Sequence, residues 1–482
     1  MNMDVQRPME QHMEIKRFYL TCLAHASYLV HDGGEAAVID PQRDVALYID
    51  EARELGVRIR WVIETHLHAD FVSGHLELAS RTGATICIGA KAGALFEHRD
   101  LNDGDEIPLG GAVLRVLATP GHTEESLCIV ALDGGAPVAV FTGDTLFIGD
   151  VGRPDLSPTK TPQELAGLLF DSLHGKLLTL PDETIVYPAH GAGSLCGKQM
   201  SSDSSSTIGR ERRLNYALQP KVREEFVTLL TAEMPTRPEY FQDEVARNRA
   251  GAAALGQLPP VAPLTPDEAA ELQAAGAVVL DTRPADQFGA AHVPGSIHIG
   301  LSGQFASWAA RLLGIDVRIV LVAEDDAAVA ESQVRLARVG IERIAGSLAG
   351  GILAWVDAGK PIRSIDQVSA QDLAEWLAAG HGSGHGLATV LDVREKSECA
   401  INGAVPNSIS IPLPELRKRV GEIDPGQPVI VLCQGGYRSS IATSLLEAAG
   451  VKQLANIVGG FDAWKLRAPE GVSAGQAACA RG

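Results

Sequence analysis

The chain has 482 residues, too many for one hydrophobic core, and 45% of them are hydrophobic, so we expect two to four domains with ordinary cores. Sixty acidic residues against 41 basic ones give a formal net charge of -19, which argues against nucleic acid or an anionic membrane surface as a partner. The N-terminal stretch is charged, and no run of 18 apolar residues occurs, so we expect neither a signal peptide nor a membrane span.

The first predicted elements are short β-rich runs that alternate with brief helical patterns over residues 14–195. Helical periodicity follows over residues 207–250, and the Pro/Ala/Gly-rich stretch 251–267 is typical of a linker. Beyond it the chain repeats itself: residues 278–301 match 389–413, and 348–361 match 457–469. The repeat predicts two related α/β modules, each a doubly wound parallel sheet. We therefore expect domains at 1–250, 262–364 and 366–470.

Candidate metal ligands follow the β-rich runs of the first domain, where strands end and loops begin. They are histidines and aspartates in the contexts THLHAD, PGHT, GD and PAH: His66, His68, Asp70, His122, Asp144 and His190. Any one of them alone is best explained as an ordinary loop residue. Six of them at strand ends favour a metal site.

These motifs resemble those of the metallo-β-lactamase superfamily, which implies an αββα sandwich. In its hydrolases, such as glyoxalase II, two metals share a bridging carboxylate and activate a hydroxide. By position, the bridge is Asp144, and the second metal needs Asp70, residue 71 and His190. Residue 71 is Phe71, which has no lone pair. The sequence therefore favours one metal.

The persulfide dioxygenase branch of that superfamily uses one metal held by two histidines and one aspartate. The matching residues are His66, His122 and Asp144, and this donor set suits one Fe(II) per chain with open positions for a persulfide and O2. The stretch 149–156 also resembles that branch, with Arg153 as the expected anchor of an anionic substrate. His68 and Asp70 are then expected to orient water or the ligands.

Cys196 lies on a Gly-rich loop near Lys198. The pattern is compatible with a low-pKa thiol that carries sulfur near the metal, and equally with a loop cysteine of no consequence. The chain has seven cysteines without regular spacing, which favours free thiols in a reducing cytosol and a cytoplasmic protein.

A second candidate site is the loop CQGGYR in the last domain, between an apolar strand and an amphipathic helix. The loop N–H groups and the helix N-terminus would stabilise an anionic sulfur at Cys433, and Arg438 can hold an incoming anion. The loop resembles the active loop of rhodaneses, which are sulfurtransferases. The rival is a related phosphatase loop with five residues between Cys and Arg; here only four intervene, the substrate-binding candidates Gln434, Gly435, Gly436 and Tyr437.

The middle module has Ala323 near the place of that cysteine, followed by three carboxylates. Without a thiol it cannot relay sulfur, so we expect a non-catalytic rhodanese homologue that serves as a scaffold or a dimer surface. Asp392 and Arg394 of the last module are expected to be structural.

The whole chain resembles fusions of a persulfide dioxygenase with rhodanese units. That resemblance implies oxidation of a low-molecular-weight thiol persulfide by O2 to sulfite, exchange of sulfane sulfur with sulfite and thiosulfate, and a role in sulfide detoxification. We also expect a homo-oligomer. Two alternatives stay open: a glyoxalase-II-like thioester hydrolase with two metals, and a non-catalytic sulfur carrier or redox sensor that uses Cys196 and Cys433.

Overall fold

The computed structural model describes residues 13–219, 222–232, 234, 236–378 and 388–467. It divides the chain into two compact units: residues 1–258 with 337–340, and residues 259–336 with 341–482. The N-terminal stretch that we expect not to be a signal peptide lies mostly outside the described residues. Among the described residues, no helix is long and apolar enough to cross a bilayer.

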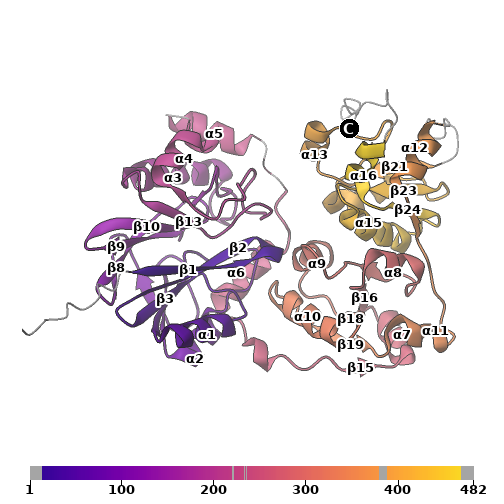
Figure 1. The fold of residues 1–482 in the computed structure, drawn as a ribbon, viewed down its shortest axis with the longest axis horizontal. Helices are drawn as coiled ribbons and strands as arrows, with labels where there is room; N and C mark the ends of the chain where they lie inside the picture. Colours follow the sequence, from indigo (N-terminus) through magenta and orange to yellow (C-terminus); the bar gives the residue numbers. More distant parts are fainter. Residues whose placement is uncertain (1–12, 220–221, 233, 235, 379–387, 468–482) are drawn as a thin grey trace, which may run out of the picture. The chain divides into compact units, whose positions relative to one another are not determined.

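The first unit contains two six-stranded mixed sheets that face each other (Figure 1). In sheet order, the first is β1 (Glu14–Leu20), β2 (His25–Asp32), β3 (Glu35–Ile39), β4 (Arg58–Ile63), β5 (Thr85–Gly89) and β6 (Arg99–Leu101). The second is β14 (Ser206–Thr207), β13 (Ile185–Pro188), β10 (Ala136–Gly143), β9 (Leu127–Asp133), β8 (Ala112–Ala118) and β7 (Glu106–Leu109). The short hairpin β11 (Leu146–Phe147) and β12 (Asp150–Val151) follows β10.

Three apolar layers hold this unit together. Residues such as Tyr28 and Phe141 pack between the two sheets. Tyr48 of α1 (Ala46–Leu55) and Leu78 of α2 (His75–Thr82) cover the outer face of the first sheet. Leu169 of α3 (Pro162–Gly175), with α5 (Arg223–Thr231), covers the second sheet. Each sheet has apolar side chains on its inner face and on its outer face. Helices must therefore cover the outer face of each sheet. The predicted αββα sandwich is confirmed.

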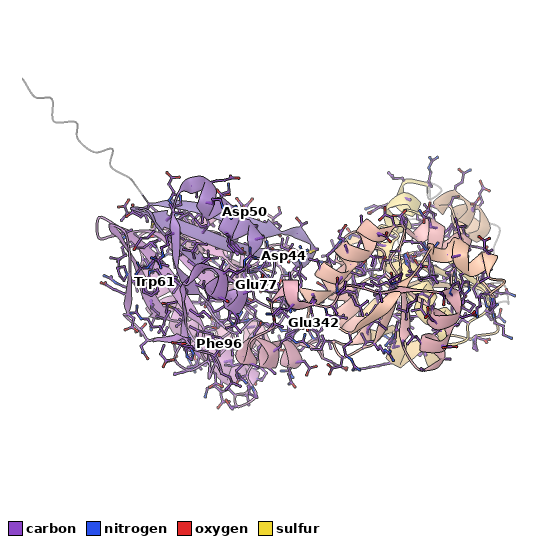
Figure 2. All side chains as sticks on the ribbon, turned by 90° about the horizontal axis from the view of Figure 1, so that it is seen from below. Asp44, Asp50, Trp61, Glu77, Phe96 and Glu342 are labelled. Atoms are coloured by element: carbon purple, nitrogen blue, oxygen red, sulfur yellow. The ribbon has the colours of Figure 1, made fainter. Side chains whose placement is uncertain are left out.

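The covering helices can be followed in Figure 2, where Asp50 marks α1, Glu77 marks α2 and Trp61 marks β4 of the first sheet. The expected helical region 207–250 contains short helices rather than one long one: α4 (Ile208–Leu214), α5 and α6 (Phe241–Ala250).

The second unit contains two five-stranded sheets in which all pairs are parallel. In sheet order, one is β15 (Pro263–Leu264), β19 (Ile344–Leu348), β18 (Ile319–Val322), β16 (Val278–Asp281) and β17 (Ile297–His298). The other is β20 (Asp366–Val368), β24 (Leu454–Ile457), β23 (Val429–Leu432), β21 (Thr389–Asp392) and β22 (Ile409–Ser410). The identical strand orders confirm the internal repeat.

Helices follow the strands of both sheets. The middle module has α7 (Pro266–Ala274), α8 (Ala285–Ala290), α9 (Phe305–Leu313), α10 (Asp326–Ala337) and α11 (Gly351–Asp357). The last module has α12 (Ala370–Ala378), α13 (Lys396–Asn402), α14 (Leu416–Arg419), α15 (Tyr437–Ala448) and α16 (Gly460–Arg467). The linker prediction is wrong at its C-terminal end, because residues 263–264 form β15 and Thr265 caps α7 in a capping box with Glu268.

Candidate metal centre and cysteine loop

The candidate ligands all lie at one edge of the sandwich. His66 follows β4, His122 lies between β8 and β9, Asp144 follows β10, and His190 follows β13. All four side chains are buried. Strands of both sheets end here, so their loops bring together ligands that are far apart in the chain.

Donor atoms of His66, His122 and Asp144 lie within 4.8 Å of one another. The Asp144 Oδ2 atom is 3.4 Å from His122 Nε2 and 3.9 Å from His66 Nε2. His122 Nδ1 donates to the Arg153 carbonyl at 3.0 Å, and His66 Nδ1 lies 3.0 Å from the Thr65 hydroxyl. Because these contacts occupy the Nδ1 atoms, both Nε2 lone pairs are free to face Asp144.

Burial keeps these two histidines in the neutral form that binds a metal. It lowers the pKa of both His66 and His122, and neighbouring histidines lower that of His66 further, so both rings stay neutral at physiological pH. His122 Nε2 and both Asp144 carboxylate oxygens are buried without a hydrogen-bond partner among the described residues. Two neutral imidazoles and one carboxylate form a facial donor set typical of mononuclear Fe(II) oxygenases.

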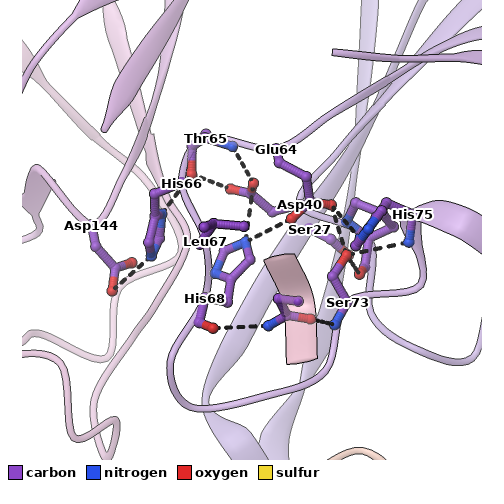
Figure 3. A network of polar contacts seen from close by, with 12 residues as sticks. Ser27, Asp40, Glu64, Thr65, His66, Leu67, His68, Ser73, His75 and Asp144 are labelled. Carbon is purple, nitrogen blue, oxygen red and sulfur yellow. Dashed lines mark hydrogen bonds and ion pairs between the residues drawn. The ribbon is translucent and has the colours of Figure 1, made fainter. Parts of the chain in front are cut away.

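Asp40 supports the His66 ligand through Thr65 (Figure 3). Its carboxylate accepts hydrogen bonds from Thr65 N at 2.7 Å and from the Thr65 hydroxyl at 2.9 Å, so the Thr65 oxygen accepts from His66 Nδ1. Asp40 itself has φ of 51°, an unusual conformation for a residue other than glycine. No motif in the sequence indicated this role of Asp40.

Phe71 fills the place where a second metal would need a nitrogen donor. Its ring centroid lies 4.0 Å from that of His25 and 4.4 Å from that of His68, and the side chain is buried. The remaining candidate ligands of that metal are Asp70 and His190, and Asp70 Oδ2 lies 3.5 Å from His190 Nε2. Donor atoms of His68, Asp70 and His190 lie within 4.8 Å of one another, but the apolar Phe71 ring stands where a second metal would need a nitrogen donor.

His25 belongs to the site although its sequence context did not single it out. Burial, with His190 and His68, lowers its pKa well below the ordinary value, and neither ring nitrogen has a hydrogen-bond partner among the described residues. A neutral imidazole that packs against Phe71 adds no charge to this part of the site.

His68 lies in a buried polar network (Figure 3). Its Nε2 is 3.2 Å from Asp40 Oδ1 and 3.5 Å from Glu64 Oε2. Burial opposes the charged ring, but the two carboxylates outweigh it and raise the pKa of His68 to about 9. Protonated His68 is a poor metal ligand and neutralises a carboxylate beside the triad.

Asn248 of α6 fixes the loop that carries these residues. Its amide donates to the carbonyl oxygens of His68 and Phe71, both at 2.8 Å, and its Oδ1 accepts from Ser73 N at 2.9 Å. Asn248 is buried, and no motif in the sequence indicated it.

Cys196 lies at the metal centre, with a donor atom within 4.8 Å of those of Asp144 and His190. Burial, together with Asp70 and Asp144, raises the pKa of its thiol well above the ordinary value. This is opposite to the low pKa that the Gly-rich loop and Lys198 suggested, because burial and the two carboxylates all disfavour the thiolate.

Arg153 lies beside the ligands, but its guanidinium is engaged. Asp155 accepts from Nε at 2.7 Å and from Nη2 at 2.8 Å, and Nη1 donates to the Leu195 carbonyl at 3.2 Å. Next to it, a Cβ on Gly152 would lie 1.9 Å from the Asp144 carbonyl oxygen, so only glycine fits there. The expected anchoring of an anion by Arg153 stays a prediction.

In the second unit, Cys433 lies between β23 and α15 and is buried. The Gly436 N–H points to its sulfur at 3.1 Å, and the Ser439 hydroxyl is 3.5 Å away. Gly436 has φ of 96°, which lets the backbone curl around the sulfur. Such N–H donors at a helix N-terminus favour an anionic sulfur.

The neighbouring candidates have defined partners. The Arg438 guanidinium is held by both carboxylate oxygens of Glu398 at 2.6 Å, a pairing that the sequence did not reveal. Gln434 Oε1 accepts from Arg394 Nη1 at 3.1 Å, and Arg394 also pairs with Asp392. The Asp392–Arg394 pair is buried, as expected of a structural role.

The middle module has no thiol at the corresponding position. Val322 pairs with Asp281 as Leu432 pairs with Asp392, so Ala323 occupies the place of Cys433. Its helix α10 starts at Asp326, and Asp325 Oδ1 accepts from Ala328 N at 2.8 Å. A carboxylate therefore occupies the helix N-terminus that would otherwise meet an anion.

Two family models match the chain. The model of the metallo-beta-lactamase superfamily matches residues 20–190, and that of the rhodanese-like domain matches residues 265–358 and 369–467. The chain therefore belongs to the metallo-beta-lactamase superfamily, as a fusion with two rhodanese-like domains.

Within that class, the N-terminal part is similar to the mitochondrial persulfide dioxygenase ETHE1 of Bos taurus, with 34% identity over 46% of this chain and 82% of that protein. A hydroxyacylglutathione hydrolase of Acidiphilium cryptum is also 34% identical, over 46% of this chain and 83% of that protein. A structure titled metallo-beta-lactamase from Staphylococcus aureus covers 70% of this chain and 98% of its own, with 32% identity and a TM-score of 0.63. Overall identity therefore does not separate the oxygenase from the hydrolase.

Proposed function

We propose that the first unit is a persulfide dioxygenase, which oxidises the outer sulfur of a low-molecular-weight thiol persulfide with O2 and one water, giving sulfite and the thiol, at one Fe(II). The observation that carries the proposal is the triad His66, His122 and Asp144 beside a position where Phe71 replaces a donor of the second metal. Similarity to persulfide dioxygenase ETHE1 supports it. Fe(II) in this triad would supply open coordination positions for a persulfide and for O2.

The protein's own residues would orient the ligands. The Arg153 carbonyl holds the His122 ring, and Asp40 acts through Thr65 on the His66 ring, so neither ring has to reorganise. The Phe71 ring packs against that of His25, and both side chains are buried.

The last module is proposed to be the sulfurtransferase. The Cys433 thiolate attacks the outer sulfur of a persulfide, forming a Cys433 persulfide and releasing the thiolate of the carrier. Sulfite then takes the outer sulfur, giving thiosulfate and regenerating the Cys433 thiolate. The N–H of Gly436 and the hydroxyl of Ser439 face the sulfur that carries the charge in both steps. Together the two units would remove sulfide-derived sulfur in the cytoplasm.

The second candidate is a thioester hydrolase with two metals, favoured by the similarity to hydroxyacylglutathione hydrolase. Phe71 argues against it, because a dinuclear site would lose a nitrogen donor. A sulfur carrier without catalysis would need only its thiols. An oxygen-electrode assay with a panel of thiol persulfides distinguishes all three. O2 uptake with release of sulfite supports the dioxygenase, whereas thioester hydrolysis without O2 uptake, or no turnover, contradicts it.

A further inference from the structure

The middle module of the second unit contacts the helix that carries the active loop of the last module. Three hydrogen bonds join β17 and the residues after it to α15. The Ser440 hydroxyl lies 2.9 Å from His298 Nδ1, the His298 N–H donates to Ser444 Oγ at 3.0 Å, and the Tyr437 hydroxyl donates to the Gly300 carbonyl at 2.8 Å.

The His298 ring is held in one tautomer. Its Nε2 lies 2.8 Å from the Arg283 carbonyl, which can only accept, so Nε2 carries the hydrogen. Nδ1 of the neutral ring is then an acceptor, and the Ser440 hydroxyl donates to it. The ring is buried and lies 4.6 Å from the Phe288 ring, so it cannot swing away without opening the core.

The first turn of α15 carries the groups that contact the sulfur. Gly436 donates its N–H to Cys433, and Ser439 follows within the same turn. The Ser440 N–H donates to the Gly436 carbonyl at 3.3 Å, which links the anchored residue to the loop. A shift of this turn therefore moves both donors relative to the sulfur.

We propose that the middle module, which has no thiol of its own, positions the Cys433 loop by fixing the first turn of α15 through His298 and Gly300. The inference rests on the proposed role of Cys433 in sulfur transfer. It assigns His298, Ser440 and the Tyr437 hydroxyl as positioning residues and gives the second rhodanese-like domain a task in the reaction.

The repeat supplies a matched control. Asp392 pairs with Ser410 as Asp281 pairs with His298, so Ser410 is the equivalent of His298 in the last module. The Ser410 hydroxyl is buried and has no hydrogen-bond partner in the part of the chain that the structure describes. Ser410→Ala therefore removes a buried hydroxyl from the same strand position without touching the contact.

The test uses the full chain and the variants His298→Ala, Ser440→Ala and Tyr437→Phe, with Ser410→Ala as control. The first readout is the rate at which iodoacetamide alkylates Cys433 at pH 7, followed on its peptide by mass spectrometry. The second is thiosulfate:cyanide sulfurtransferase kinetics. We expect each positioning variant to lower the alkylation rate and kcat by about 3- to 10-fold, the effect of one lost neutral hydrogen bond. Ser410→Ala is expected to match the parent.

Two further variants test the geometry. His298→Asn places an amide oxygen near the position of Nδ1, so it is expected to restore most of both rates. The double variant His298→Ala/Ser440→Ala is expected to lose no more than the worse single variant, because the two side chains act through one hydrogen bond. Tyr437→Phe removes only a hydroxyl and keeps the test informative if His298→Ala fails to fold.

Parental alkylation rates and kcat in all three positioning variants would overturn the proposal, as would an equal loss in Ser410→Ala. The alkylation rate reports the environment of Cys433 whether or not it transfers sulfur. Failure of the proposed function therefore shows separately, as sulfurtransferase activity that survives Cys433→Ser.

Discussion

His122 Nε2 and Asp144 Oδ2 lie 3.4 Å apart, buried at one edge of the sandwich, and neither has a hydrogen-bond partner among the described residues. Leaving such atoms buried and unsatisfied is costly unless a cation binds between them. The imidazole rings and the carboxylate therefore have the arrangement of metal ligands even without a metal.

Protein purified without oxygen is expected to contain about one iron per chain, because Phe71 offers no donor to a second metal and His68, which lies near Asp70 and His190, is protonated. His122→Ala removes one of three protein ligands and should lose most of that iron. Metal analysis by mass spectrometry checks both. Two tightly bound metals per parental chain would contradict the mononuclear site.

Phe71→His offers a nitrogen donor beside Asp70 and His190. We expect this variant to bind additional zinc, because Asp70 and His190 then gain a neutral nitrogen donor, without a gain in O2 uptake. Phe71→Leu is the control, since it keeps the pocket apolar and adds no donor. A higher rate of persulfide oxidation in Phe71→His would show that the ring is not the feature that suits the site to oxygenase chemistry.

Cys433→Ser is expected to abolish sulfur transfer, by about three orders of magnitude or more, because a hydroxyl cannot form a persulfide. O2 uptake and sulfite release should persist, since the metal ligands are untouched. Asp144→Ala is expected to do the reverse. Chromatography of bimane-labelled sulfur species measures both. If the thiosulfate yield is unchanged in Cys433→Ser, Cys196 becomes the thiol to test.

A cysteine placed at position 323 is expected not to rescue Cys433→Ser. In Ala323→Cys the thiol would face Glu324 and Asp325, and the helix N-terminus is already capped by Asp325. Like charges and a shorter loop disfavour the thiolate there. The thiosulfate:cyanide assay on the double variant tests this, and turnover above that of Cys433→Ser alone would refute it.

The stability of the second unit is expected to fall in acid partly through His298. Burial lowers the pKa of this ring, so between that pKa and the ordinary value of 6.5 the unfolded state binds a proton that the folded state does not. The contribution of His298 to the free energy of unfolding is therefore fully present above pH 6.5 and declines below it. Urea unfolding at pH 7.5 and 5.5 should show a smaller loss for His298→Asn than for the parent.

The sequence alone indicated the three modules, the αββα and parallel-sheet classes, and the two candidate sites. These features depend on short-range patterns: strand runs that end in His or Asp, a repeat matched at both ends, and one Cys-to-Arg loop. Ala323 could be placed because strand and loop motifs align the two halves of the repeat. The same patterns wrongly assigned residues 263–267 to a linker, since a Pro-rich stretch can lie within a linker or directly before a capped helix.

Only the tertiary structure revealed what surrounds those motifs. His25, Asp40 and Asn248 act on the metal loop from strands and helices distant in sequence, and Glu398 reaches Arg438 across 40 residues. The pKa of Cys196 is raised because the fold buries its thiol and brings Asp70 and Asp144 near it, which its sequence neighbours did not indicate. Sequence motifs identify the side chains that take part in chemistry. The protonation state of those side chains depends on burial and on nearby charges, and both depend on which chain segments the fold packs together.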